Sequence, residues 1–372
     1  MKILYVTDGI APYVVGGMQA VSRRQITGLA SYGIDVHYVH SFRGKPRQET
    51  DLPGEEHVLD YPFRKGFSRL SPMHYPNELI SYSEEVDAIV RKVQPDVIYS
   101  EGPLVHKTLS RVDRPPVVFH PHGLDMFQNQ MSFIRNLRAR TLRPIFGFHS
   151  RRAERVFTQG GCLTEILTNT IGVPKERVTF LPNAVPGDAK YEAKGRSGDI
   201  LKCLFVGRDD PKKGFGLLRQ ALNSSSRMTL DVVGMDGEDT RKLRWHGVVR
   251  DPERIRKFYQ DADVLVLSSY SEGMATVLLE AMQAGTPSIA TDVGASREVV
   301  INEKTGWLIQ PGSAILVAEA IQQAAAMKEE EYLRFSGNCL AHVNDNFSAA
   351  VVTRRLVELL CEVAAKPTMN RN

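Results

Sequence analysis

The sequence contains no apolar run approaching the roughly 20 residues that cross a bilayer, and its first residues, MKILYVTDG, are too short and too strand-like for a secretion signal. Its four cysteines (Cys162, Cys203, Cys339 and Cys361) lack the paired spacing of a disulfide framework or of a zinc motif. These absences argue against a membrane-spanning protein and against a disulfide-stabilised secreted domain. They predict a cytoplasmic protein with reduced thiols and no bound metal.

Compositional bias is absent as well. The chain of 372 residues is 42% hydrophobic and 24% charged, which leaves enough apolar side chains for full cores and gives no sign of disorder. Such a length suits two domains of ordinary size. The net charge is +4, and no nucleic-acid partner is predicted.

The glycine fingerprint G-x-G-x-x-G of dinucleotide-binding proteins is also missing. Residues 2–7 (KILYVT) are predicted to form a buried strand, followed by a loop that ends in Gly16 and Gly17 and then by a helix. The glycine pair either forms a plain tight turn or lets the backbone approach a ligand closely. Because the G-x-G-x-x-G fingerprint is missing, a nicotinamide-dependent oxidoreductase is disfavoured.

What the sequence does contain is a regular alternation of short apolar runs with helical patterns, which predicts an α/β protein with parallel sheets and right-handed crossovers. Residues 41–83 have little hydrophobic period. The predicted strands are 2–7, 35–40, 96–100, 117–119, 155–159, 178–181, 201–207, 229–233, 244–249, 264–267, 288–291 and a last one in TGWLIQPGS. We expect a first domain at 1–185, a polar linker at 186–199, a second domain at 200–350 and a final amphipathic helix at about 351–368.

The second domain is organised around residues 263–287, which read as a buried strand, a serine and glycine turn, and a helix. Glu272 lies in the turn and Glu280 lies in the helix. The backbone N–H groups from Met274 to Val277, at the start of this helix, are suited to bind phosphate. The two carboxylates are suited to accept hydrogen bonds from sugar hydroxyls, although on an ordinary α/β protein they would simply be solvated.

The segment EGMATVLLE resembles the Glu-x7-Glu signature of retaining GT-B glycosyltransferases, most closely glycosyltransferase family 4. The family pattern commonly reads EGFGxxxxE, so Met274 and Ala275 depart from it. The resemblance implies two Rossmann-like domains whose parallel sheets face each other across a cleft. It also implies that Glu272 positions the donor sugar and that Glu280 holds the ribose.

Two cations, Arg208 and Lys213, follow the predicted strand 201–207 and precede a helix. Together with the N–H groups of that helix they could offset the charge of a diphosphate, although basic loop residues are often merely solvated. The segment is similar to the GR-xxxx-KG loop of the family, with Lys212 as an extra base. The resemblance implies that Arg208 and Lys213 stabilise a leaving nucleotide diphosphate without a metal.

His122 follows another predicted strand, in FHPHGLDMF, at the strand end where ligands bind in open α/β sheets. A lone histidine is usually structural, but the family has a histidine here against the donor sugar. A metal pair with His120 is not supported, because no third ligand is suggested by the spacing. The resemblance extends the substrate-binding set to Gly16, Gly17, Gly247, Val248, Gly273, Met274, Ala275, Thr276, Val277 and Glu280.

The resemblance therefore predicts a retaining hexosyltransferase that moves a sugar from a nucleotide-diphosphate donor, by default a UDP-sugar, to an acceptor hydroxyl. No cofactor and no metal are implied, and the leaving phosphate takes the proton of the acceptor. Two alternatives use the same architecture: a nucleotide-sugar epimerase and a non-catalytic sugar-nucleotide-binding protein.

A basic segment suggests where the acceptor lies. Aromatic and aliphatic residues between positions 133 and 148 accompany seven arginines: Arg135, Arg138, Arg140, Arg143, Arg151, Arg152 and Arg155. Such a patch could rest on the inner face of an anionic membrane, or it could be solvated. The first interpretation predicts a lipid-linked or glycan acceptor in cell-surface polysaccharide synthesis.

Overall fold

The computed structural model describes residues 1–11, 13–14, 17–42, 50–61, 74–128, 133–185, 191–196, 198–223 and 228–365, without the side chains of residues 74, 75, 133–135 and 138. Gly16 lies outside the described residues. The chain forms two compact units. Described residues up to 183 and from 349 onward form unit 1, and residues 184–348 belong to unit 2.

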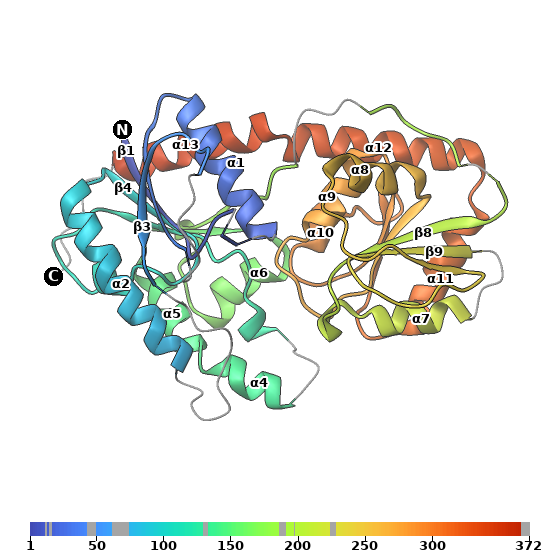
Figure 1. Ribbon diagram of the computed structural model, residues 1–372, viewed down its shortest axis with the longest axis horizontal. Helices are drawn as coiled ribbons and strands as arrows, with labels where there is room; N and C mark the ends of the chain where they lie inside the picture. The colour runs from blue at the N-terminus through green and yellow to red at the C-terminus, as the bar shows by residue number, and fades with distance from the viewer. Residues whose placement is uncertain are drawn as a thin grey trace. The chain divides into compact units, whose positions relative to one another are not determined.

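Unit 1 is built on a seven-stranded parallel sheet in the order β3-β2-β1-β4-β5-β6-β7 (Figure 1). The strands are β1 (Lys2–Val6), β2 (Asp35–Ser41), β3 (Glu55–Leu59), β4 (Val97–Ser100), β5 (Val117–Phe119), β6 (Arg155–Thr158) and β7 (Val178–Phe180). The central strands are buried on both faces, which explains their continuous apolar sequences.

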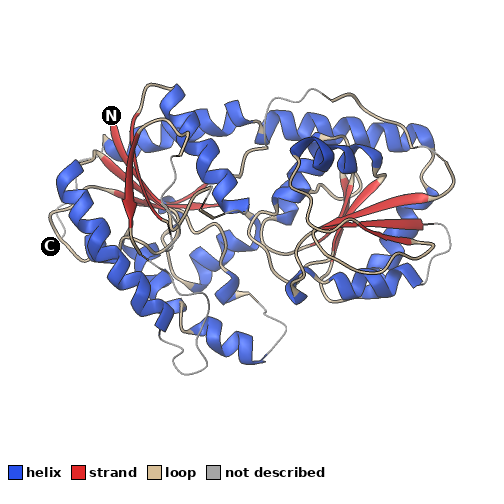
Figure 2. Cartoon of the chain, viewed as in Figure 1, coloured by secondary structure: helices blue, strands red, loops and turns tan. Residues whose placement is uncertain are grey.

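Helices join and cover these strands (Figure 2). They are α1 (Gly17–Ser31), α2 (His74–Val93), α3 (His106–Leu109), η1 (Asp125–Phe127), α4 (Phe133–Arg140), α5 (Arg143–Arg152), α6 (Gly161–Glu165), the π-helical turn η2 (Ile166–Thr170), η3 (Lys175–Arg177) and α13 (Ala349–Ala364). The last of them packs against α1. A Cβ at Gly28 of α1 would come within 2.7 Å of the Thr353 side chain, so the two helices approach closely.

Unit 2 repeats the arrangement with six parallel strands in the order β10-β9-β8-β11-β12-β13. Its strands are β8 (Leu201–Val206), β9 (Met228–Val233), β10 (Leu243–Trp245), β11 (Val264–Leu267), β12 (Ser288–Thr291) and β13 (Gly306–Ile309). Its helices are η4 (Pro211–Lys213), α7 (Phe215–Asn223), α8 (Pro252–Asp261), α9 (Thr276–Gln283), α10 (Ser296–Val299), α11 (Ala314–Ala326) and α12 (Glu329–Phe347). Both sheets therefore have the Rossmann strand order.

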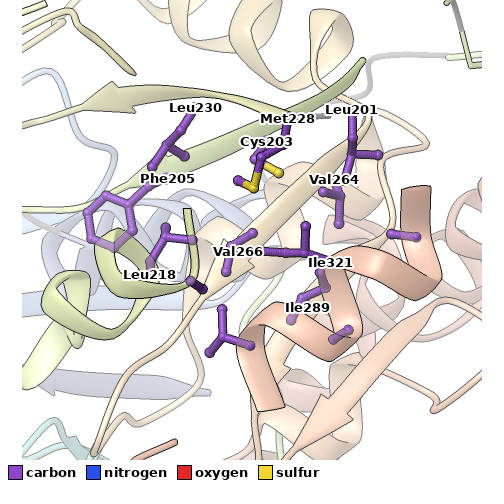
Figure 3. Close-up of a cluster of buried hydrophobic side chains, with 14 of the residues drawn as sticks. Leu201, Cys203, Phe205, Leu218, Met228, Leu230, Val264, Val266, Ile289 and Ile321 are labelled. Carbon is purple, nitrogen blue, oxygen red and sulfur yellow. The ribbon is translucent and has the colours of Figure 1, made fainter. Parts of the chain in front are cut away.

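One large cluster of the unit 2 core lies against one face of its sheet. Alternate residues of β8 (Leu201, Cys203 and Phe205) point to the same side and meet Leu218 of α7 and Ile321 of α11 (Figure 3). Each such side chain is at most 1% exposed, and burying one of the larger ones contributes about 1.5–3 kcal/mol. Burial also raises the pKa of the Cys203 thiol, so this cysteine packs as an apolar side chain.

Three elements differ from the sequence-based prediction. The segment 41–83 was expected to lack a strand, yet it contains β3, a half-exposed edge strand without an apolar run. Helix α2 begins at residue 74, whereas the sequence pattern predicts a helix only from about residue 83 to residue 93. Strand β10 ends at Trp245 and does not reach residue 249, because Gly247 has a φ of +60°, which breaks the extended backbone.

His149 of α5 is fully buried, and burial lowers its pKa to about 3. The unfolded chain therefore binds more protons than the folded chain between about pH 6.5 and pH 3, and stability falls as the pH falls through this range. We expect the change to His149→Leu to reduce the loss of unfolding free energy between pH 7 and pH 5 by about 2 kcal/mol. Urea unfolding at both pH values measures the difference, and an unchanged pH dependence would contradict the assignment.

Candidate functional site

The strand order of unit 2 reverses between β8 and β11, and ligands bind at the carboxyl ends of the strands at such a switch point. The loop after β8 carries Arg208 and Lys213, and the loop after β11 carries Glu272. Residues predicted separately from two distant segments thus meet at one place in the fold.

The loop after β8 is fastened to the end of β11 through Gly214. This glycine has a φ of +66°, and a Cβ on it would lie 1.9 Å from the carbonyl oxygen of Ser268. The Ser268 hydroxyl in turn donates a hydrogen bond of 3.0 Å to the Gly214 carbonyl. Only glycine fits this contact, which fixes the position of the preceding Lys213.

Lys213 and Glu272 form an ion pair. The Lys213 Nζ lies 2.7 Å from Glu272 Oε1, and the Ser269 hydroxyl donates to the same oxygen at 2.6 Å. Glu272 is only 7% exposed and has little access to water. The Lys213 cation and the Ser269 hydroxyl compensate its charge. An ammonium has three donors, and the bond to Glu272 uses one of them.

The backbone of the Glu272 turn is held by Gly294, a glycine that is not among the predicted site residues. Gly294 has a φ of +55°, and a Cβ there would lie 2.3 Å from the carbonyl oxygens of both Glu272 and Gly273. The N–H group of Ala295 donates to the Gly273 carbonyl at 2.9 Å. A glycine soon after β12, in DVGAS, was the available signal, but its contact partner lies about 20 residues earlier.

Helix α9 starts at Thr276, with Ala275 as its N-cap residue. Alanine has no side-chain oxygen, so no side chain caps the first N–H groups, which also have no acceptor within the helix. Met274 and Ala275 are buried, whereas Thr276 and Val277 are partly exposed. An anion is favoured at this end of the helix by its N–H groups and by the helix dipole.

Glu280, within α9, is held by a hydrogen bond from the neighbouring helix α8. The hydroxyl of Tyr259, on α8, donates to Glu280 Oε2 at 2.7 Å. Burial, and then the Glu280 charge, raises the pKa of Tyr259 well above its ordinary value, so this hydroxyl stays protonated. The two predicted carboxylates thus have different partners: Glu272 contacts the β8 loop and Glu280 contacts α8.

The remaining predicted residues of unit 2 lie at the carboxyl ends of β8 and β10. Arg208 is exposed. Gly247 accepts a backbone hydrogen bond of 2.7 Å from Gly234, and Val248 is 69% exposed. The Gly247 carbonyl is therefore already used within the unit.

In unit 1 the strand order reverses between β1 and β4, and Glu101 directly follows β4. Glu101 is 2% exposed and accepts two hydrogen bonds, from Ser22 of α1 at 2.5 Å and from His122 Nε2 at 2.6 Å. The His122 Nδ1 lies 3.2 Å from the amide nitrogen of Gln159, which donates to Asn183 at 2.9 Å. His122 therefore belongs to a polar network that spans five segments of unit 1.

This network determines the tautomer of His122. A carboxylate only accepts hydrogen bonds, so the ring nitrogen that faces Glu101 carries the proton. The Gln159 amide nitrogen is a donor and therefore faces the unprotonated Nδ1. Glu101 is absent from the residues predicted from the sequence, although a glutamate directly after a buried strand is a usable signal. Gly17, also predicted, is the exposed first residue of α1.

If His122 contacts the donor sugar as predicted, the change to Glu101→Gln is expected to lower kcat/KM by about 10–100-fold, because a hydrogen bond to a charged group contributes about 1.5–3 kcal/mol. Steady-state kinetics of Glu101→Gln, His122→Ala and the double variant test whether Glu101 acts through His122. The double variant should then be no slower than His122→Ala. Additive losses would show that Glu101 acts independently, and Ser22→Ala provides a milder change at the same carboxylate.

The second histidine of the motif is fully buried. The Tyr99 hydroxyl lies 2.5 Å from His120 Nδ1, and the His120 and His122 rings are 4.1 Å apart between centroids. Burial, and then the neighbouring His122, lowers the pKa of His120 well below its ordinary value. Tyr99 is hydrogen-bonded to Nδ1 of His120, and Glu101 is hydrogen-bonded to Nε2 of His122. This geometry agrees with a structural role for His120.

Most arginines of the basic segment bind their own unit. Backbone or hydroxyl oxygens of unit 1 accept hydrogen bonds from Arg143, Arg151, Arg152 and Arg155. The side chains of Arg135 and Arg138 lie outside the description, and Arg140 is exposed on α4 beside the exposed Leu137. In the described part of the chain, every helix is too short or too polar to cross a bilayer.

Comparisons with known proteins agree with this architecture. The family model of Glycosyltransferase Family 4 matches residues 15–188, and that of Glycosyl transferases group 1 matches residues 189–338. The D-inositol 3-phosphate glycosyltransferase of Arthrobacter sp. (strain FB24) is 33% identical over 360 residues, which cover 82% of this chain and 81% of that protein.

Solved structures share the fold at low sequence identity. Sucrose-phosphate synthase from Thermosynechococcus elongatus superposes with a TM-score of 0.81 at 21% identity, covering 98% of this chain and 99% of that one. HepE from Anabaena, in complex with UDP-glucose, has a TM-score of 0.68 at 17% identity and coverages of 97% and 100%. WaaG, a glycosyltransferase involved in lipopolysaccharide biosynthesis, has a TM-score of 0.69 at 16% identity and coverages of 96% and 99%.

Two Rossmann-ordered sheets, family models that match successive halves of the chain, and a relative of 33% identity along most of its length lead to one assignment. The chain belongs to the group 1 and family 4 glycosyltransferases of the GT-B fold.

Proposed function

We propose that this glycosyltransferase takes a hexose from a UDP-sugar and transfers it to an acceptor hydroxyl with retention of the anomeric configuration. The observation that carries the proposal is the Lys213–Glu272 pair, which joins two loops at the switch point of unit 2. It places a cation suited to a diphosphate beside a carboxylate suited to sugar hydroxyls. The UDP-glucose complex of HepE, which has the same fold, supports the choice of donor.

The diphosphate binds in this proposal to the start of α9 and to two cations. The uncapped N–H groups after Ala275 provide backbone donors, and the two donors of Lys213 that Glu272 does not use remain for phosphate oxygens. Arg208, which is exposed at the end of β8, adds a second cation. As the bond to the sugar breaks, negative charge grows on the diphosphate, and these groups stabilise it most at that stage.

The sugar and the nucleoside are held by carboxylates. Glu272 positions the donor sugar, and Glu280 accepts hydrogen bonds from the ribose, with Tyr259 fixing its orientation. His122 is proposed to hydrogen-bond the donor sugar, and backbone groups near Gly247 and Val248 are proposed to contact the base.

Retention fits the state of Glu272. A carboxylate that already accepts from Lys213 and Ser269 is a weak nucleophile. The proposed reaction is therefore a front-face displacement: the acceptor oxygen attacks from the side on which the diphosphate leaves. The leaving phosphate oxygen takes the acceptor proton, so the reaction needs neither a covalent sugar–enzyme intermediate nor a metal ion.

The acceptor is proposed to be a glycan or a lipid-linked saccharide of the cell surface. WaaG, with the same fold, is involved in lipopolysaccharide biosynthesis. Four arginines of the basic segment bind unit 1, so the part of this segment proposed to contact an anionic membrane is α4, where Arg140 and Leu137 are exposed.

A thermal-shift panel of nucleoside diphosphates and their sugar conjugates identifies the donor, because a ligand that binds only the folded state raises the melting temperature. UDP and one UDP-hexose are expected to give the largest shifts. NMR of the transferred sugar then reads the anomeric configuration, with and without a chelator. An inverted product, chelator-sensitive turnover, or isomerisation of the donor without transfer would each overturn the proposal.

A further inference from the structure

A group of potential metal ligands lies in unit 1 on the edge strand β3 and its neighbour β2. In the parallel register, His37 pairs with Glu55, and Val39 pairs with His57. Since side chains alternate between the faces of a strand, His37, Glu55 and His57 lie on the same face of the sheet. Both histidines are the third residue of their strands, whereas His122 and its partner Glu101 lie beyond the carboxyl ends of β5 and β4.

The donor atoms of these three side chains lie close together. His37 Nδ1 is 3.2 Å from His57 Nε2 and 3.6 Å from Glu55 Oε2. The distance from His57 Nε2 to Glu55 Oε1 is 3.5 Å. Tetrahedral zinc, with bonds of about 2.0–2.1 Å, requires ligand atoms about 3.3 Å apart. The two histidine nitrogens are at about this separation. Each faces a different oxygen of Glu55, and with one ligand atom taken from each residue the three atoms lie within 4.8 Å of one another.

The surroundings favour the required tautomer of His37. Asp35 Oδ1 lies 3.5 Å from His37 Nε2, the nitrogen that faces away from the group. A proton on Nε2 is attracted by this carboxylate and leaves Nδ1 unprotonated. In the metal-free protein Nδ1 then accepts a hydrogen bond from His57 Nε2, and a cation bound between the two rings replaces that proton. The histidine side chains are 10% and 9% exposed, whereas Glu55 is 60% exposed, so an ion can enter from the solvent side.

We propose that His37, Glu55 and His57 bind one divalent transition-metal ion of the zinc class, with water in the remaining coordination position. Two imidazoles and one carboxylate suit Zn²⁺, Co²⁺, Ni²⁺ or Cu²⁺, whereas Mg²⁺ and Ca²⁺ prefer sites made of oxygen ligands. Within the described residues, this is the one group of at least three such side chains with ligand atoms this close.

The bound ion has a structural consequence. It connects the edge strand β3, whose residues are partly or fully exposed, to β2, which is almost entirely buried. Binding to the folded state alone raises its stability by mass action. The ion takes no part in sugar transfer, so the metal-free protein is expected to keep its turnover at temperatures well below its melting point.

The test uses the full chain without a polyhistidine tag, stripped with a chelator and titrated calorimetrically with Zn²⁺. We expect one equivalent to bind, Co²⁺ to give the intense visible absorption of a tetrahedral site, and the melting temperature to rise. The change to Glu55→Gln removes a ligand that is mostly exposed, so this variant is expected to fold. Loss of an outer-shell partner lowers metal affinity by about 10–100-fold. The zinc affinity of Asp35→Asn should fall within that range, and the zinc affinity of Glu55→Gln should fall by more.

His342→Gln, on α12 in unit 2, is the matched control, because it removes one imidazole that hydrogen-bonds a backbone carbonyl and a side-chain amide. Its zinc affinity should equal that of the parent protein. The proposal fails if the parent protein binds no Zn²⁺, or if Glu55→Gln and His57→Gln bind it as tightly as the parent. Circular dichroism without metal verifies that each variant is folded.

Discussion

Replacing Lys213 by alanine is expected to lower turnover by about 100–1000-fold, the range measured when one preorganised donor to a developing charge is removed. Lys213 is the cation that Gly214 and Ser268 hold against the end of β11, so the ammonium is already in place before the donor binds. The loss should appear both in kcat and in the affinity for UDP, because the ammonium contacts the diphosphate in the ground state and more strongly in the transition state.

The neighbouring Lys212 provides a matched control. The change to Lys212→Ala removes the same charge one residue away in the same helical turn, and it should change turnover by less than about tenfold. Because Lys213→Ala removes the cation that compensates the charge of the buried Glu272, thermal denaturation must accompany the kinetics. A folded Lys213→Ala variant with unchanged turnover would remove Lys213 from the mechanism.

The stretch 263–287 could be interpreted from the sequence because its signals are local. A buried strand, a turn and a helix follow each other without interruption, so Glu272 was correctly placed before the helix and Glu280 within it. The period of the apolar residues and the glycine that ends the helix are properties of neighbouring residues along the chain.

Contacts between distant segments were beyond the sequence. Lys213 and Glu272 are 59 residues apart, and nothing in either loop names the other as its partner. Glu101 and His122 meet because β4 and β5 are neighbours in the sheet, which is a fact of strand order. Strand β3 was missed for a related reason: EEHVL has no apolar run, and only pairing with β2 makes it a strand.

The Lys213–Glu272 ion pair leads to a second prediction, in which one substitution slows sugar transfer without weakening UDP binding. With the change to Glu272→Gln, the side chain keeps its volume and can still accept from Ser269, but the charge that neutralises Lys213 is gone. UDP should therefore bind as well as before or more tightly, because all three donors of the ammonium become available to phosphate. Transfer should fall by about 10–100-fold, since hydrogen bonds from sugar hydroxyls to a charged carboxylate are replaced by weaker ones to an amide.

Calorimetry with UDP and steady-state kinetics with the UDP-sugar distinguish this role from a structural one. If Glu272 only kept the β8 loop in place, Glu272→Gln would weaken UDP binding together with transfer, as Lys213→Ala does. Retained UDP affinity with slow transfer instead assigns the carboxylate to the sugar. The comparison is informative because both variants alter the same 2.7 Å contact from opposite sides, so a general loosening of the loop would affect them alike.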